Sequence, residues 1–125
     1  MKIKNIFYKL RLYKMITHKM KLSEPYYSLV KTNKKTVEIR VYDEKRKQLS
    51  VGDKILFTKT DGSGEFRRPI KKLSVSKNFE TALKRSTLRK AMPNLCKISD
   101  AVDIYHSFPN YKKDAKKYGV LSIYF

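Results

Sequence analysis

The chain has 125 residues, of which 41% are hydrophobic and 12% aromatic, so it can form one domain with a buried core. This composition excludes a collagen, a coiled coil and a wholly disordered chain. The 30 Lys and Arg residues against 11 Asp and Glu residues give a formal net charge of +19, which favours a polyanionic partner, nucleic acid before an anionic membrane. The alternative is a Lys-rich composition whose charges are merely solvated.

The few cysteine and histidine residues exclude several kinds of site. Cys96 is the single cysteine of the sequence, so neither an intrachain disulfide nor a zinc site built on thiolates can form. His18 and His106 lack the spacing of metal ligands, and no motif requires a cofactor. We therefore expect neither a bound metal ion nor a cofactor. A chain of this kind suits a reducing, intracellular compartment, the cytoplasm first and the nucleus second.

Residues 1–16 are interpreted as a basic N-terminal extension, and residues 17–125 as the domain. The apolar residues of the extension fall near helical spacing, which predicts a basic amphipathic helix. Its candidate roles are a nucleic-acid arm, a membrane-surface helix and an organelle-targeting peptide. We favour instead a loosely ordered segment, or residues upstream of a start at Met15 or Met20. No apolar run reaches the length of a membrane span.

The first part of the domain predicts a strand, a short helix and a second strand. Met20 and Leu22 indicate the first strand, and Ser23 is the expected N-cap of the helix. Asn33 tolerates the left-handed backbone conformation that ends such a helix. Residues 34–41 then alternate between polar and apolar side chains, a period of two that is typical of a half-buried strand.

The strand over residues 34–41 carries the candidate site. Its polar face presents Thr36, Glu38 and Arg40 in a row, with successive side chains roughly 6.5–7 Å apart. Lys35 lies on the opposite register at the start of the strand, where its long side chain can curl over the edge. An acid held among these groups in so basic a chain predicts a function for Glu38. The alternative is an ordinary ion pair between Glu38 and Arg40, worth under about 1 kcal/mol on a surface.

The remainder of the chain predicts three further strands and several short helices. Turn residues separate strands over residues 54–58 and 70–77, and the loop with Gly62 and Gly64 between them is interpreted as a hairpin tip. Helical spacing then predicts a helix capped by Asn78, a short helix or loop over residues 86–96, and a helix capped by Ser99.

The closing segment, residues 118–125, is apolar enough to be a long strand that completes a sheet or a barrel. The order of elements lacks the repeated βαβ alternation of a parallel sheet. We therefore expect an α+β fold, a small, mostly antiparallel β-barrel of about five strands with short helices on its flank.

Three segments follow one another in a specific order. Residues 33–40 read Asn-Lys-Lys-Thr-Val-Glu-Ile-Arg, residues 51–57 read Val-Gly-Asp-Lys-Ile-Leu-Phe, and residues 105–121 hold an aromatic helix followed by Tyr-Gly-Val-Leu. They resemble the Gly-x-Lys-x-x-Glu-x-Arg signature, the Val-Gly-Asp turn and the C-terminal helix and strand of the ASCH domain family, in the PUA-like superfamily. The resemblance spans about residues 17–125, with Asn33 in place of the family's glycine.

The resemblance implies a PUA-like β-barrel with a cleft beside the signature strand that binds RNA or a nucleotide. It also implies an alternative, because some relatives are amidohydrolases that act on acetylated cytidine (N4-acetylcytidine) and others are reported as ribonucleases. In the amidohydrolases a Lys and a Thr of the signature are implicated. Lys35 stands at the Lys position, whereas Glu38 stands at the Thr position and Thr36 is shifted by two residues.

We prefer binding to hydrolysis and expect five residues to contact the ligand: Lys35, Thr36, Glu38, Arg40 and Tyr111. Glu38 would act as a general base or accept hydrogen bonds from the edge of cytosine or guanine, and Arg40 would bind a phosphate or orient Glu38. Lys35 would neutralise an anion or, with a lowered pKa, act as an acid or base. Lys35 and Glu38 are the candidate catalytic residues of the alternative.

Aromatic and basic side chains complete the predicted interface. The aromatic candidates for stacking on a base are Tyr26, Tyr27, Tyr105, Phe108 and Tyr111. Most are expected in the core, and we favour Tyr111 because it follows Pro109 and Asn110 outside the predicted helix. The basic candidates for a phosphate-facing rim are Arg67, Arg68, Lys71, Lys72, Lys112 and Lys113, with a solvated strand face as the alternative.

Overall fold

The computed structural model describes residues 15–125, so the predictions for residues 1–14 lie outside the described residues. The strands are β1 (Thr17–Leu22), β2 (Val37–Val41), β3 (Lys54–Lys59), β4 (Phe66–Pro69), β5 (Lys72–Ser76) and β6 (Val120–Tyr124). The helices are α2 (Tyr26–Lys31), the short 3-10 helix η1 (Arg46–Gln48), α3 (Phe79–Ser86), α4 (Leu88–Ala91), α5 (Ile98–Ser107) and α6 (Tyr111–Tyr118).

The strands form two small sheets of three strands each, in the orders β1-β3-β4 and β2-β6-β5. Strands β1 and β3 are parallel, and the other three pairings are antiparallel. The prediction of an α+β fold with mostly antiparallel strands is therefore confirmed. The predicted barrel is not found, because the pairings within residues 15–125 leave the two sheets unclosed.

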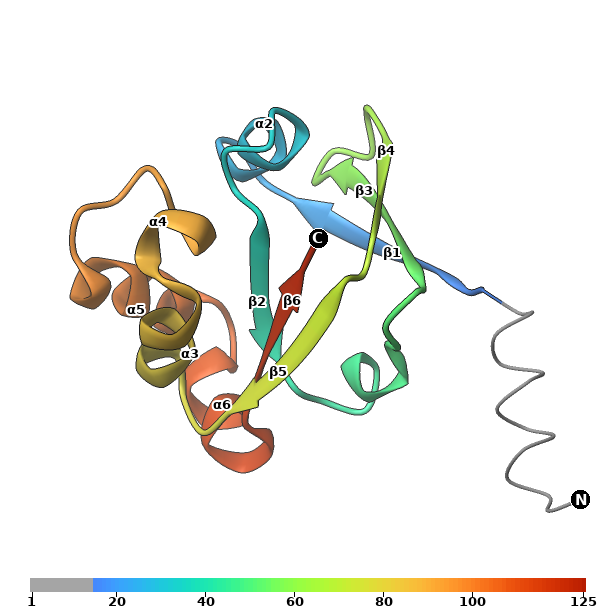
Figure 1. Cartoon of the computed structure of the whole chain (residues 1–125). Coiled ribbons are helices and arrows are strands. Elements are labelled where there is room, and N and C mark those ends of the chain that lie inside the picture. Colours follow the sequence, from blue (N-terminus) through green and yellow to red (C-terminus); the bar gives the residue numbers. More distant parts are fainter. Residues whose placement is uncertain (1–14) are drawn as a thin grey trace, which may run out of the picture.

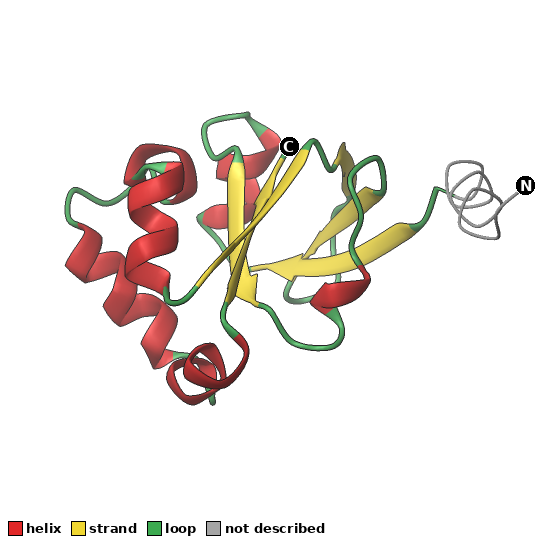
Figure 2. Cartoon of the chain, turned by 60° about the horizontal axis from the view of Figure 1, so that its bottom comes forward, coloured by secondary structure: helices red, strands yellow, loops and turns green. Residues whose placement is uncertain are grey.

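The elements lie in three layers (Figures 1 and 2). Helices α3, α4, α5 and α6 cover one face of the β2-β6-β5 sheet, and the β1-β3-β4 sheet lies on its other side. One hydrophobic cluster joins β2 to these helices, and a second joins the two sheets and α2. Strand β6 lies in the middle and contributes Val120 to the first cluster and Leu121 and Ile123 to the second. Burial on both faces explains why its sequence is apolar except for the buried Ser122 and the terminal Tyr124.

Two of the predicted helix boundaries are confirmed. The side chain of Asn78 accepts a hydrogen bond of 2.8 Å from the N–H of Thr81 and so caps α3. Asn33 follows α2 with a φ of 63°, the left-handed conformation that was predicted to end this helix.

Two other predicted caps are wrong. Ser23 does not cap α2, where the carboxylate of Glu24 instead accepts hydrogen bonds from the N–H and the hydroxyl of Ser28. Helix α5 begins at Ile98, one residue before Ser99, and its N-cap position carries no side-chain cap. In both cases a residue of suitable type lay within one turn of the true boundary, which local sequence alone does not locate.

Three elements were not predicted at all, the short 3-10 helix η1, strand β4 and helix α6. Strand β4 is short and polar, but its pairing with β3 supplies the hydrogen bonds that its own sequence does not suggest. Helix α6 begins after Asn110, whose φ of 65° reverses the chain, and ends at Gly119. A side chain at Gly119 would need a φ of 82° and would place its Cβ 3.1 Å from the carbonyl oxygen of Ser76, so glycine is required.

Residues 15–125 contain no helix that is long and apolar enough to cross a membrane. Over the same residues, no group of three or more His, Cys, Asp or Glu side chains is placed to hold a metal ion. Cys96 is exposed and has a free thiol.

Candidate functional site

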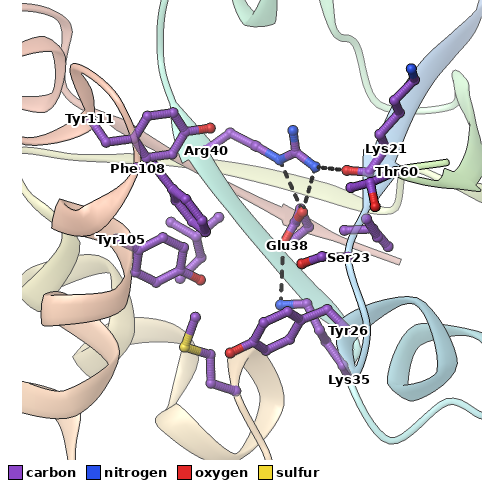
Figure 3. A pocket seen from close by; sticks show the side chains of 13 residues that line it. Lys21, Ser23, Tyr26, Lys35, Glu38, Arg40, Thr60, Tyr105, Phe108 and Tyr111 are labelled. Carbon is purple, nitrogen blue, oxygen red and sulfur yellow. Dashed lines mark hydrogen bonds and ion pairs between the residues drawn. The ribbon is translucent and has the colours of Figure 1, made fainter.

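A cavity of about 220 Å³ lies between β1 and β2, each of which is an edge strand of its sheet (Figure 3). Its charged and hydroxyl-bearing lining residues are Lys21, Ser23, Lys35, Glu38, Arg40 and Thr60. Its aromatic and aliphatic lining residues are Leu22, Tyr26, Ile39, Met92, Tyr105, Phe108 and Tyr111. The cavity therefore combines a charged floor on β2 with aromatic walls from α2, α5 and α6.

Glu38 lies at the centre of the charged floor. Its Oε1 is 3.3 Å from Nζ of Lys35, and its Oε2 accepts a hydrogen bond of 3.0 Å from Nε of Arg40 and forms an ion pair of 2.9 Å with Nη2 of Arg40. Only 7% of the Glu38 side chain is exposed, so the predicted half-buried strand has its polar face covered as well. The carboxylate is a buried anion between two cations.

Lys35 reaches Glu38 by the curl around the strand edge that the sequence allowed. Its ammonium donates to the carbonyl oxygen of Val37 at 2.7 Å and also to that of Ala91, while Glu38 lies on its third side. An ammonium group has three hydrogens, and each has an acceptor here. The side chain is almost wholly buried. Lys35 is thus fixed in place by three acceptors.

The pKa values of these three groups follow from burial and from their neighbours. Burial lowers the pKa of Lys35, and the charge of Glu38 offsets only part of this effect. Burial alone would raise the pKa of Glu38, but the charges of Lys35 and Arg40 outweigh it and hold that pKa below its ordinary value. Burial also opposes the charge of Arg40, whose pKa is nevertheless raised by Glu38.

The lowered pKa of Glu38 predicts a contribution to acid stability. The unfolded chain ionises Glu38 near the ordinary pKa of 4.5, and the folded protein ionises it at a lower pH. The unfolded state therefore binds more protons in this window, so the stabilisation is complete above pH 4.5 and is lost as the pH falls through the folded pKa. In urea unfolding at a series of pH values, Glu38→Gln should show a flatter acid limb than wild type.

Glu24 and Asp61 also have lowered pKa values, but both are exposed and both remain in the variant. The difference between the two pH profiles of the unfolding free energy therefore reports the contribution of Glu38. Parallel acid limbs for wild type and variant would contradict the ionic role of this carboxylate.

The aromatic wall is built on Phe79, which is completely buried. The ring of Tyr105 is stacked on it with a centroid distance of 4.5 Å and an angle of 5°, and the ring of Tyr111 lies nearly parallel at 5.9 Å and 9°. Phe108 contacts Tyr111 edge to face at 5.3 Å. Tyr26 lies beside Lys35, whose Nζ is 5.8 Å from its ring centroid. The cavity thus presents several ring surfaces that are suited to a flat ligand.

The hydroxyl of Tyr105 is buried and, among the described residues, has no hydrogen-bond partner. Figure 3 shows it pointing into the cavity. Burial, together with the negative charge of Glu38, raises the pKa of Tyr105 well above its ordinary value, so the hydroxyl is neutral and can donate. A buried hydroxyl without a partner costs about 1–3 kcal/mol. A ligand in the cavity would supply the missing hydrogen bond.

The structure brings four of the five predicted contact residues together: Lys35, Glu38, Arg40 and Tyr111. Thr36 does not line the cavity. Its N–H donates to the carbonyl oxygen of Lys90 in α4, and its own carbonyl oxygen accepts from the N–H of Phe125, so its backbone links the start of β2 to α4 and to the end of the chain. Tyr111 lies outside α5, as predicted, and is the first residue of α6, which was not predicted.

Of the other aromatic candidates, Tyr26, Tyr105 and Phe108 line the cavity, whereas Tyr27 is buried in the second hydrophobic cluster. The predicted basic rim is not part of the cavity wall. Arg67 and Arg68 lie on β4, and Lys71 and Lys72 lie at β5, the strands at the edges away from β1 and β2. Lys112 and Lys113 follow Tyr111 in α6 and are exposed. The role of all six as a rim stays a prediction.

Several lining residues were not predicted, namely Lys21, Ser23, Thr60 and Met92. The alternation of Lys19 and Lys21 with buried Met20 and Leu22 is a signal that could have placed Lys21 on the outer face of β1. Met92 follows α4 and reaches the cavity through tertiary packing, for which the sequence offers no local signal.

The sequence profile of the ASCH domain family matches residues 20–125, from within β1 to the end of the chain. The chain belongs to the ASCH domain family. The crystal structure of hypothetical protein PH0355 is 33% identical to this ASCH domain, covers 87% of this chain and 96% of its own, and has a TM-score of 0.78. The solution NMR structure of protein PF0455 from Pyrococcus furiosus is 29% identical, covers 87% and 94%, and has a TM-score of 0.68. No curated protein matches the sequence.

Proposed function

We propose that this ASCH domain binds RNA or a nucleotide and takes one base into the cavity between β1 and β2. The observation that carries the proposal is the Tyr105 hydroxyl, which is buried, unpaired among the described residues and directed into a cavity with aromatic walls. The volume of about 220 Å³ lies below the roughly 300–1,000 Å³ of sites for drug-sized ligands, which suits a single base.

The chemistry of the walls matches the two faces of a base. Ring stacking is worth about 1–3 kcal/mol per base in single-strand binders, and Tyr105, Phe108, Tyr111 and Tyr26 offer such rings. Sequence-specific RNA recognition commonly takes an unstacked base between aromatic side chains and reads its edge by hydrogen bonds.

The edge of the base would be read by Glu38 and Tyr105. A carboxylate accepts about four hydrogen bonds. Three are used by the contacts with Lys35 and Arg40, so one acceptor position at Oε1 remains for a base N–H. The hydroxyl of Tyr105 adds a donor in the same cavity. This combination favours the polar edge of a base over an apolar ligand of the same size.

Tyr105→Phe tests the proposal because it removes only the unpaired hydroxyl and keeps the ring that stacks on Phe79. We expect the affinity for short RNA and for mononucleotides to fall roughly threefold to tenfold, as for the loss of one hydrogen bond. The free energy of unfolding should stay equal or rise, because the free protein no longer buries an unsatisfied hydroxyl. Fluorescence anisotropy and urea unfolding measure the two effects.

Tyr118→Phe is the matched control, since Tyr118 is half-buried and lines no part of the cavity. The control should leave the affinity unchanged. Equal affinities for wild type, Tyr105→Phe and the control would contradict recognition by the hydroxyl of Tyr105.

Hydrolysis of a modified nucleoside such as N4-acetylcytidine, or of RNA, is a second candidate. It is favoured by the lowered pKa of Lys35 and by the position of Glu38 in the same cavity. Against it, all three ammonium hydrogens of Lys35 have acceptors within the protein, which leaves none for a substrate. Product analysis after incubation with either substrate tests this candidate, and turnover lost in Glu38→Gln with binding intact would support it.

A further inference from the structure

A second cavity of about 470 Å³ lies beside the first and has a different character. Its basic lining residues are His18, Lys19, Lys21, Arg40, Lys45 and Arg46. Among the described residues, no Asp or Glu lines it. A pocket with cations on its walls and no acid attracts an anion, and phosphate is the anion that matches several such side chains at once.

Lys21 and Arg40 line both cavities and so mark their junction. The guanidinium of Arg40 donates from Nη2 to the carbonyl oxygen of Lys21 at 2.8 Å and from Nε to Glu38, with which Nη2 also forms an ion pair (Figure 3). Among the described residues, Nη1 of Arg40 has no hydrogen-bond partner. A ligand group at the junction would therefore meet a fixed guanidinium edge and a lysine.

Three lysines of the second cavity are the available cations. Arg46 is paired with Asp43 at 3.0 Å, and His18 contacts Asp53 at 2.8 Å. Lys19, Lys21 and Lys45 are exposed and have no ion pair among residues 15–125. Lys19 and Lys21 lie on one face of β1, roughly 6.5–7 Å apart. This spacing is comparable to that of successive phosphates in an extended single strand.

We propose that the second cavity holds the phosphodiester backbone of a single-stranded RNA whose base occupies the first cavity, with Lys21 and Arg40 at the point where base and backbone diverge. This inference rests on the proposed function and specifies its ligand as a strand, not a free nucleoside. The contacts of Lys19 and Lys45 are to phosphate, so they add affinity without reading sequence.

The test compares two double variants with wild type. Lys19→Gln/Lys45→Gln changes the second cavity, and Lys77→Gln/Lys116→Gln changes two exposed lysines that line neither cavity. The ligands are a pentaribonucleotide, the four free nucleosides and a short polyglutamate peptide. Binding of the pentaribonucleotide is measured over a series of salt concentrations.

We expect the Lys19/Lys45 variant to bind the pentaribonucleotide about tenfold more weakly at about 0.15 M salt, and its salt slope to be smaller by about 1.4, or about 0.7 for each phosphate that is no longer neutralised. Nucleoside binding should be unchanged. The Lys77/Lys116 control should show a clearly smaller decrease in affinity for RNA.

Equal decreases in the two double variants would overturn the inference, and so would competition by polyglutamate as strong as that by RNA. The proposed function would survive either result if Tyr105→Phe still weakens nucleoside binding. If the Lys19/Lys45 variant loses RNA binding while Tyr105→Phe has no effect, the result supports phosphate binding in the second cavity and contradicts base recognition by the hydroxyl of Tyr105. Absence of pentaribonucleotide binding by wild type would overturn the inference, and absence of nucleotide binding as well would contradict the proposed function.

Discussion

Lys35→Met is expected to lower the free energy of unfolding by about 3–5 kcal/mol, the range for breaking a buried ion pair from one side. The substitution keeps the aliphatic volume of the side chain but removes the ammonium that contacts Glu38 and the carbonyl oxygens of Val37 and Ala91. Three acceptors then lose a donor in a region where only 2% of Lys35 is exposed. Urea unfolding followed by circular dichroism measures the change.

Lys34→Met is the matched control, because Lys34 is adjacent and exposed. We expect its effect to stay within about 0.5 kcal/mol. The double variant Lys35→Met/Glu38→Gln should be less destabilised than the sum of its parts, with a coupling of about 0.5–3 kcal/mol. A destabilisation by Lys35→Met no larger than that by Lys34→Met would show that the buried ion pair does not stabilise the fold.

The second large effect is expected on binding. Glu38→Gln should weaken binding of a base by roughly 10- to 100-fold, which corresponds to about 1.5–3 kcal/mol for a hydrogen bond to a charged group. The amide has one acceptor oxygen, and Lys35 and Arg40 both lie within reach of it. No acceptor position is then left for the ligand, and the new NH₂ group competes with the N–H that a base would donate. Isothermal titration with mononucleotides measures the decrease in affinity.

Glu38→Asp serves as the second variant, because it retains the charge and shortens the side chain. It should keep more of the stability than Glu38→Gln and recover part of the affinity. Circular dichroism establishes that each variant is folded at the titration temperature. An unchanged affinity in folded Glu38→Gln, with no turnover of any nucleotide substrate in wild type, would contradict the role of Glu38 in this site.

The parts of the site that sequence could predict are those that depend on local geometry. The period of two placed Glu38 and Arg40 on one face of a strand, and the length of the Lys35 side chain allowed it to reach the same carboxylate from the other register. Asn33 was identified as a helix end because its short side chain tolerates a positive φ. In each case neighbouring residues along the chain determine the outcome.

The parts that sequence could not predict depend on contacts between distant segments. Tyr105 has the same helical spacing as a core residue, and only the packing of α5 against α3 and α6 turns its hydroxyl into the cavity. Lys21 lines the cavity because β1 and β2 are edge strands of two different sheets. The sequence of a single strand does not show its place in a sheet. Helix α6 begins directly after Asn110, whose residue type is as typical of the end of a helix as of the start of one.

The stacking of Tyr105 and Tyr111 near Phe79 has a consequence for how a base would bind. Their rings are oriented by a residue that is completely buried, so their positions are set before a ligand arrives. Immobilising a flexible side chain on binding costs about 0.5–1.5 kcal/mol, a cost that a pre-organised ring avoids. Packing in the hydrophobic core thus fixes the orientation of the aromatic wall. The free and bound forms of this wall should therefore differ little in conformation.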